Sequence, residues 1–138
     1  MANALFDWAR QGFLSGAILW DANSIKVLLM SAGYSVNLNS TVYVASAAAA
    51  RAGVIWSSTT ALSSTTVASG VADALDHTLT TVTGNSAAYM LIYADTGVST
   101  TSRVIAYIDT VTGLPVTPNG GDITIQWDNT AATKIFCL

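Results

Sequence analysis

Charged side chains, cysteine and histidine are scarce in this 138-residue chain. The single cysteine, Cys137, cannot form an internal disulfide, which excludes a disulfide-rich secreted scaffold and a zinc site built from cysteines. Only 9% of the residues are charged, well below the roughly one quarter that is usual, and all eight acidic residues are Asp. With five scattered basic residues and a net charge of -3, the chain has no basic patch that would bind nucleic acid or an anionic membrane.

Long apolar runs are missing as well, although 51% of the residues are hydrophobic. No window approaches the roughly 18 consecutive apolar residues of a membrane-spanning helix. The chain begins MANALFDWARQG, which puts Asp7 where a signal peptide has its apolar segment, so we expect no secretion signal and assembly in a cytoplasm. The length fits one domain with a core of its own.

Small side chains take the place of charge: Ser and Thr together number 32, and Ala numbers 22. A monomer with such a surface lacks the charge that keeps small domains apart in solution. A chain that packs against copies of itself does not need that charge. The composition therefore favours a homo-oligomer.

One helix is predicted, over Asn3–Ser15, with Asn3 as its N-cap and Gly16 as its stop. Three large apolar side chains fall on one face at helical spacing: Leu5, Trp8 and Phe13. A helix of about three turns is marginal by itself in water, so this face must dock on the protein's own core or, as an arm, on a neighbouring molecule. We divide the chain into an N-terminal helical arm, residues 1–16, and a single β-rich domain, residues 17–138. If the arm fastens a neighbouring molecule, deletion of residues 2–16 should leave the β-rich domain folded.

The remainder of the chain predicts short strands separated by turns rich in Ser, Thr and Gly. The strongest hairpin candidate joins Ala87–Ala94 to Arg103–Asp109 through a polar loop, and the apolar centre of Ser24–Ser31 predicts an interior strand. Further strands are expected at Gly53–Ser58, Thr65–Ala68, His77–Thr83, Asp122–Asp128 and Lys134–Leu138, the last two paired through the loop between them. No helices alternate with these strands. The expected fold is therefore mainly β, an antiparallel β-sandwich or barrel-like domain with one short N-terminal helix.

The last two strands carry predictions for single residues. Asp122–Asp128 alternates between apolar and polar positions, which should face inward and outward respectively. The inward set is Ile123, Ile125 and Trp127, and the outward set is Thr124 and Gln126. Cys137 is expected to be a reduced, packed thiol without a chemical role.

Residues for catalysis or metal binding do not gather in a known pattern. His77 is the only histidine, its neighbour Asp76 would point to the opposite face of a strand, and no serine lies in a G-x-S-x-G elbow. We expect His77 to be an exposed strand residue and the protein not to be an enzyme, with no metal ion and no cofactor. Four aspartates stand where a strand meets a turn, without the spacing of a calcium loop, and should cap backbone N–H groups: Asp95, Asp109, Asp122 and Asp128.

Two of the four tryptophans, Trp20 and Trp56, have polar neighbours in the sequence. This predicts exposed rings that serve an interface or a platform for a glycan. The interface is favoured, because a sugar site would also need clustered acidic or amide groups. The candidate interface residues are Leu5, Trp8, Phe13, Trp20 and Trp56.

Two long segments resemble small structural proteins of tailed bacteriophages. They are ALFDWARQGFLSGAILWDANSIKVLLM near the start and IAYIDTVTGLPVTPNGGDITIQWDNTAATKIFCL at the end. The shared features are a Phe-Leu-Ser-Gly stretch, a TGLPVTPNGGDI-type turn, a Trp-Asp-Asn step and a Lys-Ile-Phe ending, at residues 13–16, 112–123, 127–129 and 134–136. The middle of the chain, Ser31–Ser69, diverges.

Within that group the resemblance implies a capsid decoration, or cement, protein. Such proteins sit on the outer shell as oligomers, often trimers at local threefold positions, and fasten neighbouring capsid subunits. The implied partners are copies of the chain and the major capsid protein, on the capsid surface of a virion assembled in the host cytoplasm, without nucleic acid or a membrane. Two alternatives stay open: a tail, neck or baseplate component, and a glycan-binding module on the virion surface.

Overall fold

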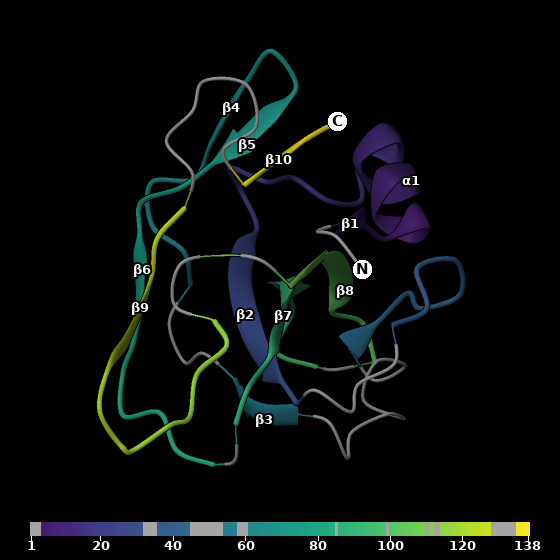
Figure 1. Cartoon of the computed structure of the whole chain (residues 1–138). Helices are drawn as coiled ribbons and strands as arrows, with labels where there is room; N and C mark the ends of the chain where they lie inside the picture. The colour runs from purple at the N-terminus through teal and green to yellow at the C-terminus, as the bar shows by residue number, and fades with distance from the viewer. Residues whose placement is uncertain are drawn as a thin grey trace.

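The computed structural model describes residues 4–31, 36–44, 54–57, 61–84, 86–98, 100–109, 111, 114–127 and 135–138, with 54–57 described for the backbone only. These residues form short strands and one helix, arranged as three antiparallel sheets in a sandwich-like body (Figure 1). The mainly β fold predicted from the sequence is confirmed.

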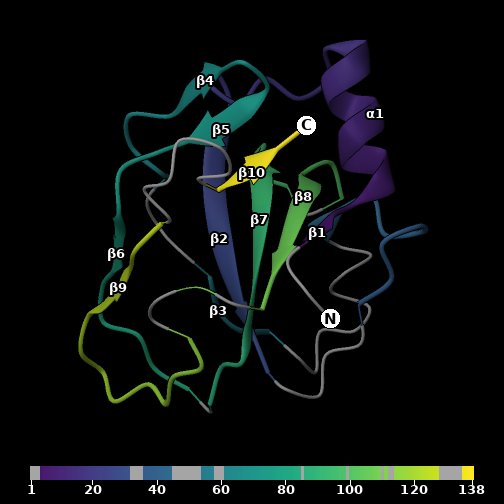
Figure 2. The same ribbon diagram turned by 45° about the horizontal axis from the view of Figure 1, so that its top comes forward.

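The largest sheet has five strands in the order β1-β8-β7-β2-β3, and all neighbours are antiparallel. Their bounds are β1 Ala4–Leu5, β2 Ser24–Met30, β3 Val54–Ser57, β7 Tyr89–Asp95 and β8 Arg103–Ile108. β7 and β8 form the hairpin that the sequence predicts, and β2 lies beside β7 along its full length (Figure 2). Successive side chains in the middle of β7 are all buried, so both faces of this sheet are covered.

Two smaller sheets complete the body. One holds β10 (Phe136–Cys137), β5 (Val71–Asp73) and β4 (Thr66–Ala68) in that order, and the other pairs β6 (His77–Leu79) with β9 (Ile123–Ile125). In Figures 1 and 2 the three-stranded sheet lies at the end of the central sheet near the helix. The β6–β9 ribbon runs outside β2 in both views.

The pairing of the last strand differs from the prediction. The sequence predicts a hairpin between Asp122–Asp128 and Lys134–Leu138, but β9 pairs with β6 and β10 pairs with β5. The observed pairing brings the ring of Phe136 against the rings of Trp20 and Phe13. Packing of these rings favours the distant partner over the nearby one.

The helix α1 spans Asp7–Ser15 and starts later than predicted. Its N-cap is Phe6, not Asn3, because Ala4–Leu5 are extended and pair with β8. Tertiary pairing here overrides a local helix signal. The helix stops at Gly16, as predicted, where a left-handed φ of 75° lets the chain turn away.

The N-terminal segment is tied to the β body. Phe6 is fully buried, and its backbone N–H donates to the Ile105 carbonyl oxygen at 3.0 Å, while Leu5 is buried in the same core. Deletion of residues 2–16 would remove one strand and a buried ring from the core, which argues against a β domain that folds without them. The division into residues 1–16 and 17–138 otherwise stays a prediction.

Strand β9 and the residues after it alternate as predicted. The apolar positions are buried or half-buried and the polar positions are exposed, in the order Ile123, Thr124, Ile125, Gln126 and Trp127. Trp127 also donates two hydrogen bonds, from its indole N–H to the Leu75 carbonyl oxygen at 3.1 Å and from its backbone N–H to the Asp76 carboxylate at 3.0 Å. These bonds and the burial fix the ring in the core.

Candidate functional site

An apolar cavity of about 190 Å³ is lined by residues of α1, β4, β5 and the last residues of the chain. Its walls come from the helix, the loop after it, the β4–β5 hairpin and the residues of β10. The lining residues are Phe13, Ile18, Leu19, Trp20, Asp21, Val67, Gly70, Ala72, Phe136 and Leu138. We call this surface, together with the neighbouring Leu14, the apolar end.

Aromatic contacts hold the walls of the cavity in place. The ring of Phe136 meets Trp20 edge-on, with centroids 5.1 Å apart, and meets Phe13 at 5.7 Å. Trp20 is buried, and its indole N–H donates to the Asp73 carbonyl oxygen at 2.9 Å. Ring contacts of this kind fix the elements relative to one another, so the cavity is already formed in the single chain.

Four aliphatic side chains at the apolar end are open to solvent. The exposed fractions are 90% for Leu14, 60% for Leu138, 55% for Val67 and 49% for Leu19. Single exposed apolar residues are ordinary on a protein surface, but several of them around one apolar cavity mark a surface that another molecule covers.

The β4–β5 hairpin positions Val67 at the rim of the cavity. Ser69 and Gly70 form its turn with φ values of 51° and 79°, the paired left-handed values of a type I′ turn. The Gly70 carbonyl oxygen accepts a hydrogen bond from the Leu138 N–H at 2.8 Å, which seats the end of the chain against the same turn. The turn therefore sets the positions of two exposed side chains at once.

The five residues predicted for an interface lie in different environments. Leu5 is buried in the protein's own core, and Phe13 is a half-buried wall of the cavity. Trp8 is 39% exposed, and its indole N–H donates to the Asn39 carbonyl oxygen at 3.0 Å. Trp56 lies on β3, and its side chain is outside the described residues.

The prediction of an exposed ring at Trp20 is wrong. The polar neighbours of Trp20 shape a tight loop, in which the Asn23 side-chain oxygen accepts a hydrogen bond from the Leu19 N–H at 2.6 Å. That loop turns Trp20 inward and leaves Leu19 exposed. A glycan platform on Trp20 is therefore excluded by its burial.

None of the four exposed aliphatic residues of the apolar end is predicted from the sequence: Leu14, Leu19, Val67 and Leu138. Leu14 carries a usable signal, because it is a leucine outside the apolar face of its helix. Val67 and Leu138 carry none, because their exposure depends on which strands pair with β5.

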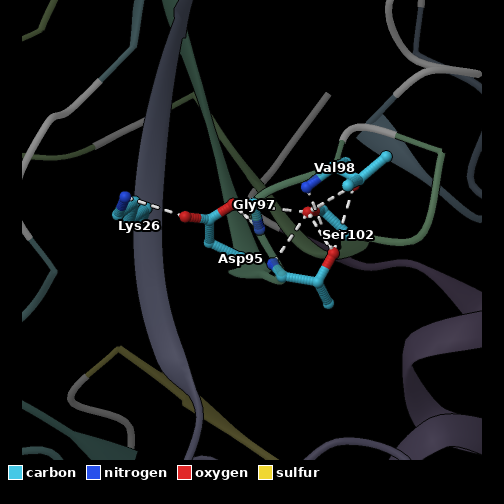
Figure 3. A network of polar contacts seen from close by, with 6 residues as sticks. Lys26, Asp95, Gly97, Val98 and Ser102 are labelled. Atoms are coloured by element: carbon cyan, nitrogen blue, oxygen red, sulfur yellow. Dashed lines mark hydrogen bonds and ion pairs between the residues drawn. The ribbon is translucent and has the colours of Figure 1, made fainter.

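A polar network closes the loop between β7 and β8 (Figure 3). The Asp95 carboxylate forms an ion pair with Lys26 Nζ at 2.8 Å and accepts a hydrogen bond from the Gly97 N–H at 3.0 Å. The hydroxyl of the buried Ser102 donates to the Val98 carbonyl oxygen at 2.9 Å. These polar groups are engaged in holding the loop, which argues against a catalytic role for them.

The pKa values of Asp95 and Tyr93 are shifted in this region. The hydrogen bond from Lys26 is the main reason why the pKa of Asp95 lies below its usual 3.8. Burial, with the charge of Asp95 as the second cause, raises the pKa of Tyr93 to about 12. Both shifts keep Asp95 ionised and Tyr93 neutral at physiological pH.

The predicted capping of local backbone donors is confirmed at Asp95, which accepts a hydrogen bond from the Gly97 N–H at 3.0 Å. Asp122 accepts instead from the N–H of the distant Thr81 at 3.1 Å. For the other two it stays a prediction, and the second of them lies outside the described residues: Asp109 and Asp128.

Two predictions about reactive side chains are wrong. His77 is buried at the start of β6, with Nε2 lacking a hydrogen-bond partner among the described residues, and burial lowers its pKa. Its neighbour Asp76 accepts a hydrogen bond from the Trp127 N–H. Cys137 is exposed rather than packed, because Phe136 takes the inward position of this short strand and the next residue faces outward.

Among the described residues, no three His, Cys, Asp or Glu side chains gather in a group that would hold a metal ion. No helix in the same part of the chain is long and apolar enough to cross a membrane. The sequence matches no protein-family model, and no curated protein is significantly similar to it. The apolar end, with its cavity and exposed aliphatic rim, is the feature on which a functional proposal rests.

Proposed function

We propose that the protein is a structural component of a tailed-phage virion that decorates and stabilises the capsid, binding between capsid subunits as a trimer. The observation that carries the proposal is the apolar end, a cavity ringed by exposed aliphatic side chains in a chain of which only 9% is charged. The resemblance of both ends of the sequence to small phage structural proteins supports the virion as its setting.

The apolar end favours assembly because its exposure costs free energy. Full burial of a side chain such as Leu14 gains about 1.5–3 kcal/mol relative to leaving it in water. A free monomer does not realise this gain, whereas an assembled protein does. Contacts repeated over a capsid lattice then reinforce one another, because each bound site raises the effective concentration of the next.

The outer surface of α1 offers the best contact for a shell. Trp8 is exposed there, and its hydrogen bond to Asn39 holds the ring in one orientation. Tryptophan is among the residues most enriched as energetic anchors of protein interfaces. Asp7 and Arg10 form an ion pair at 2.8 Å on the same helix, so the surroundings are polar but carry no net charge.

The stabilising activity follows from mass action. A protein that binds the assembled shell and not its free subunits shifts the equilibrium toward the shell. Particles that carry the protein should therefore retain their DNA at higher temperature than particles that lack it.

The number of copies per purified particle, relative to the major capsid protein, tests the location. A decoration protein is present in numbers comparable with those of the capsid subunits. A tail, neck or baseplate component is present in far fewer copies, and that result would overturn the proposal.

Addition of the purified chain to bare shells tests the contact. Wild type should bind and raise the temperature of DNA release, whereas Trp8→Ala should bind about tenfold or more weakly with its oligomeric state unchanged. Leu75→Ala trims an exposed leucine outside both α1 and the cavity and serves as the matched control. Particles that are equally robust with and without the protein contradict the stabilising role.

A further inference from the structure

We infer that the apolar end is where copies of this chain meet, with Leu14 of one copy seated in the cavity of the next. The inference deepens the oligomer in the proposed function, and only the threefold arrangement rests on that function. The occupant of the cavity is thus a second copy of the chain, not a different protein.

The cavity has the size and chemistry to receive an aliphatic side chain. Its volume is about 190 Å³, and the rings of Phe13, Trp20 and Phe136 form much of its wall. An apolar cavity of roughly 150 Å³ in a protein holds a benzene ring. A leucine side chain has four carbon atoms and is smaller than benzene, so it fits into a cavity of this volume.

Leu14 is placed to fill such a cavity in a neighbour. It lies in the last turn of α1 with 90% of its surface exposed, directly after Phe13, which lines the cavity of its own chain. The inserting side chain thus belongs to the residue that follows a lining residue of the cavity in the last turn of α1. In a trimer with a threefold axis, the three copies meet by this end. Each Leu14 then lies at the cavity of the next copy, and the three contacts close a ring.

The charge of the surface favours a second copy over a different partner. Among the described residues that line the cavity, Asp21 has the only charged side chain. Interfaces between different proteins commonly carry complementary charges that steer the encounter. Two copies of an acidic chain repel each other less where the surface between them has few charged side chains, and the described lining of the cavity has one.

The edge of β4 supplies an independent reason for a covering chain. β4 is the outermost strand of its sheet, and all three of its residues, Thr66–Ala68, are exposed. Ala68 and Val71 flank the two-residue turn and form the hydrogen-bonded pair of the hairpin. The next pair, Val67 and Ala72, is then not hydrogen-bonded, so the backbone N–H and C=O groups of Val67 point away from β5. This edge has no charge and no proline to block pairing with another chain.

The size of a standard interface sets how much of the surface of the chain the contact has to cover. A standard interface buries roughly 800 Å² on each partner. The accessible surface of the chain is 6730 Å², so such an interface takes about an eighth of it. Leu19, Val67 and Leu138 then form the rim that excludes water around the inserted leucine.

Sedimentation velocity of the full chain at micromolar concentrations tests the contact. Wild type should sediment as a trimer, and Leu14→Asp should weaken association about tenfold or more, because a carboxylate would have to enter an apolar cavity. Leu75→Asp alters an exposed leucine outside the cavity and should leave the trimer intact. Both variants should keep the wild-type circular dichroism spectrum, since both side chains face solvent in the single chain.

Disulfide trapping tests the geometry of the contact. In a Cys137→Ser background, one chain carries Leu14→Cys and a second chain carries Val67→Cys. Oxidation of the mixture should give linked pairs with one chain of each kind, identified by mass. Leu75→Cys in place of Val67→Cys should give no such pair.

The possible outcomes separate this inference from the proposed function. A wild-type chain that stays monomeric, or an oligomer that Leu14→Asp leaves unchanged, overturns the inference. A monomer that still adds to bare shells refutes the inference alone. A trimer that Leu14→Asp dissociates, but that never adds to shells, supports the inference and refutes the proposed function. A dimer with the same disulfide pattern supports the contact and overturns the threefold arrangement.

Discussion

Replacement of Trp127 tests what holds the β6–β9 ribbon on the body. The Trp127 ring is 5% exposed, and its N–H donates to the Leu75 carbonyl oxygen at 3.1 Å. Truncation of a buried tryptophan to alanine costs about 3–5 kcal/mol of unfolding free energy, through the lost burial and the cavity left behind. The Leu75 oxygen also loses its donor, which places Trp127→Ala in the upper part of that range.

Trp127→Phe separates packing from the hydrogen bond. It keeps most of the ring but removes the donor to Leu75, so we expect a cost of about 1–2 kcal/mol. The backbone bond from residue 127 to Asp76 is present in both variants and cancels from the comparison. Urea unfolding at one fixed protein concentration, followed by circular dichroism, gives the free energies. A cost below about 1 kcal/mol for Trp127→Ala would refute the placement of this ring in the core.

Four further changes test other parts of the fold. Because burial lowers the pKa of His77 below 6.5, the unfolded chain takes up the proton first, and wild type should lose stability as the pH falls through 6.5. His77→Phe should remove that loss of stability. If the unfolding free energies of the two proteins in urea depend equally on pH, His77 is not the cause of the loss. Gly16→Ala should cost about 1 kcal/mol in thermal unfolding, since φ is 75°. Apart from its two chain neighbours, no described residue has an atom within 4 Å of the added Cβ, so the backbone conformation is what opposes the change. Phe6→Ala should cost about 3–5 kcal/mol, and a chain without residues 2–16 that keeps a native circular dichroism spectrum would restore the detachable arm.

The elements that depend on local signals are predictable from the sequence. The β7–β8 hairpin is one, because two apolar strands flank a polar loop in which Asp95 caps the Gly97 N–H. The stop of α1 at Gly16 is another, because only the conformation of that residue is needed. Strand β9 is a third, because the alternation of apolar and polar residues is clean from Ile123 to Trp127, over the strand and the two residues after it.

The elements that depend on distant partners are not predictable in this way. The choice of β5 over β9 by the last strand follows from the packing of Phe136 against Trp20, which no local pattern contains. The start of α1 is misplaced for the same reason, since Ala4–Leu5 pair with a strand from the other end of the chain. His77 looks exposed by composition alone, and its burial follows from the side of β6 that faces the core.

The candidate site is partly visible in the sequence. Trp8 and Phe13 stand out as large side chains on a short helix, and the structure places the first at the surface and the second in the wall of the cavity. The polar neighbours of Trp20 misdirect the prediction, because polar residues that form a tight loop look the same as polar residues around an exposed ring. Leu14 is the missed residue with a signal, and a leucine outside the apolar face of a helix is worth examining as a contact.

The position of α1 links the two proposed contacts physically. Its first turn is fixed by β1, which pairs with β8 in the central sheet. Its last turn is fixed at Gly12, whose carbonyl oxygen accepts from the N–H groups of Ala17 and Ile18, and where a Cβ would come within 2.7 Å of the Ile18 side chain. One helix held at both ends thus carries Trp8 in its first turn and Leu14 in its last. The helix therefore sets the orientation of the two contacts, to a shell at Trp8 and to another copy at Leu14, before either partner binds. Such preorganisation lowers the conformational entropy that is lost on binding.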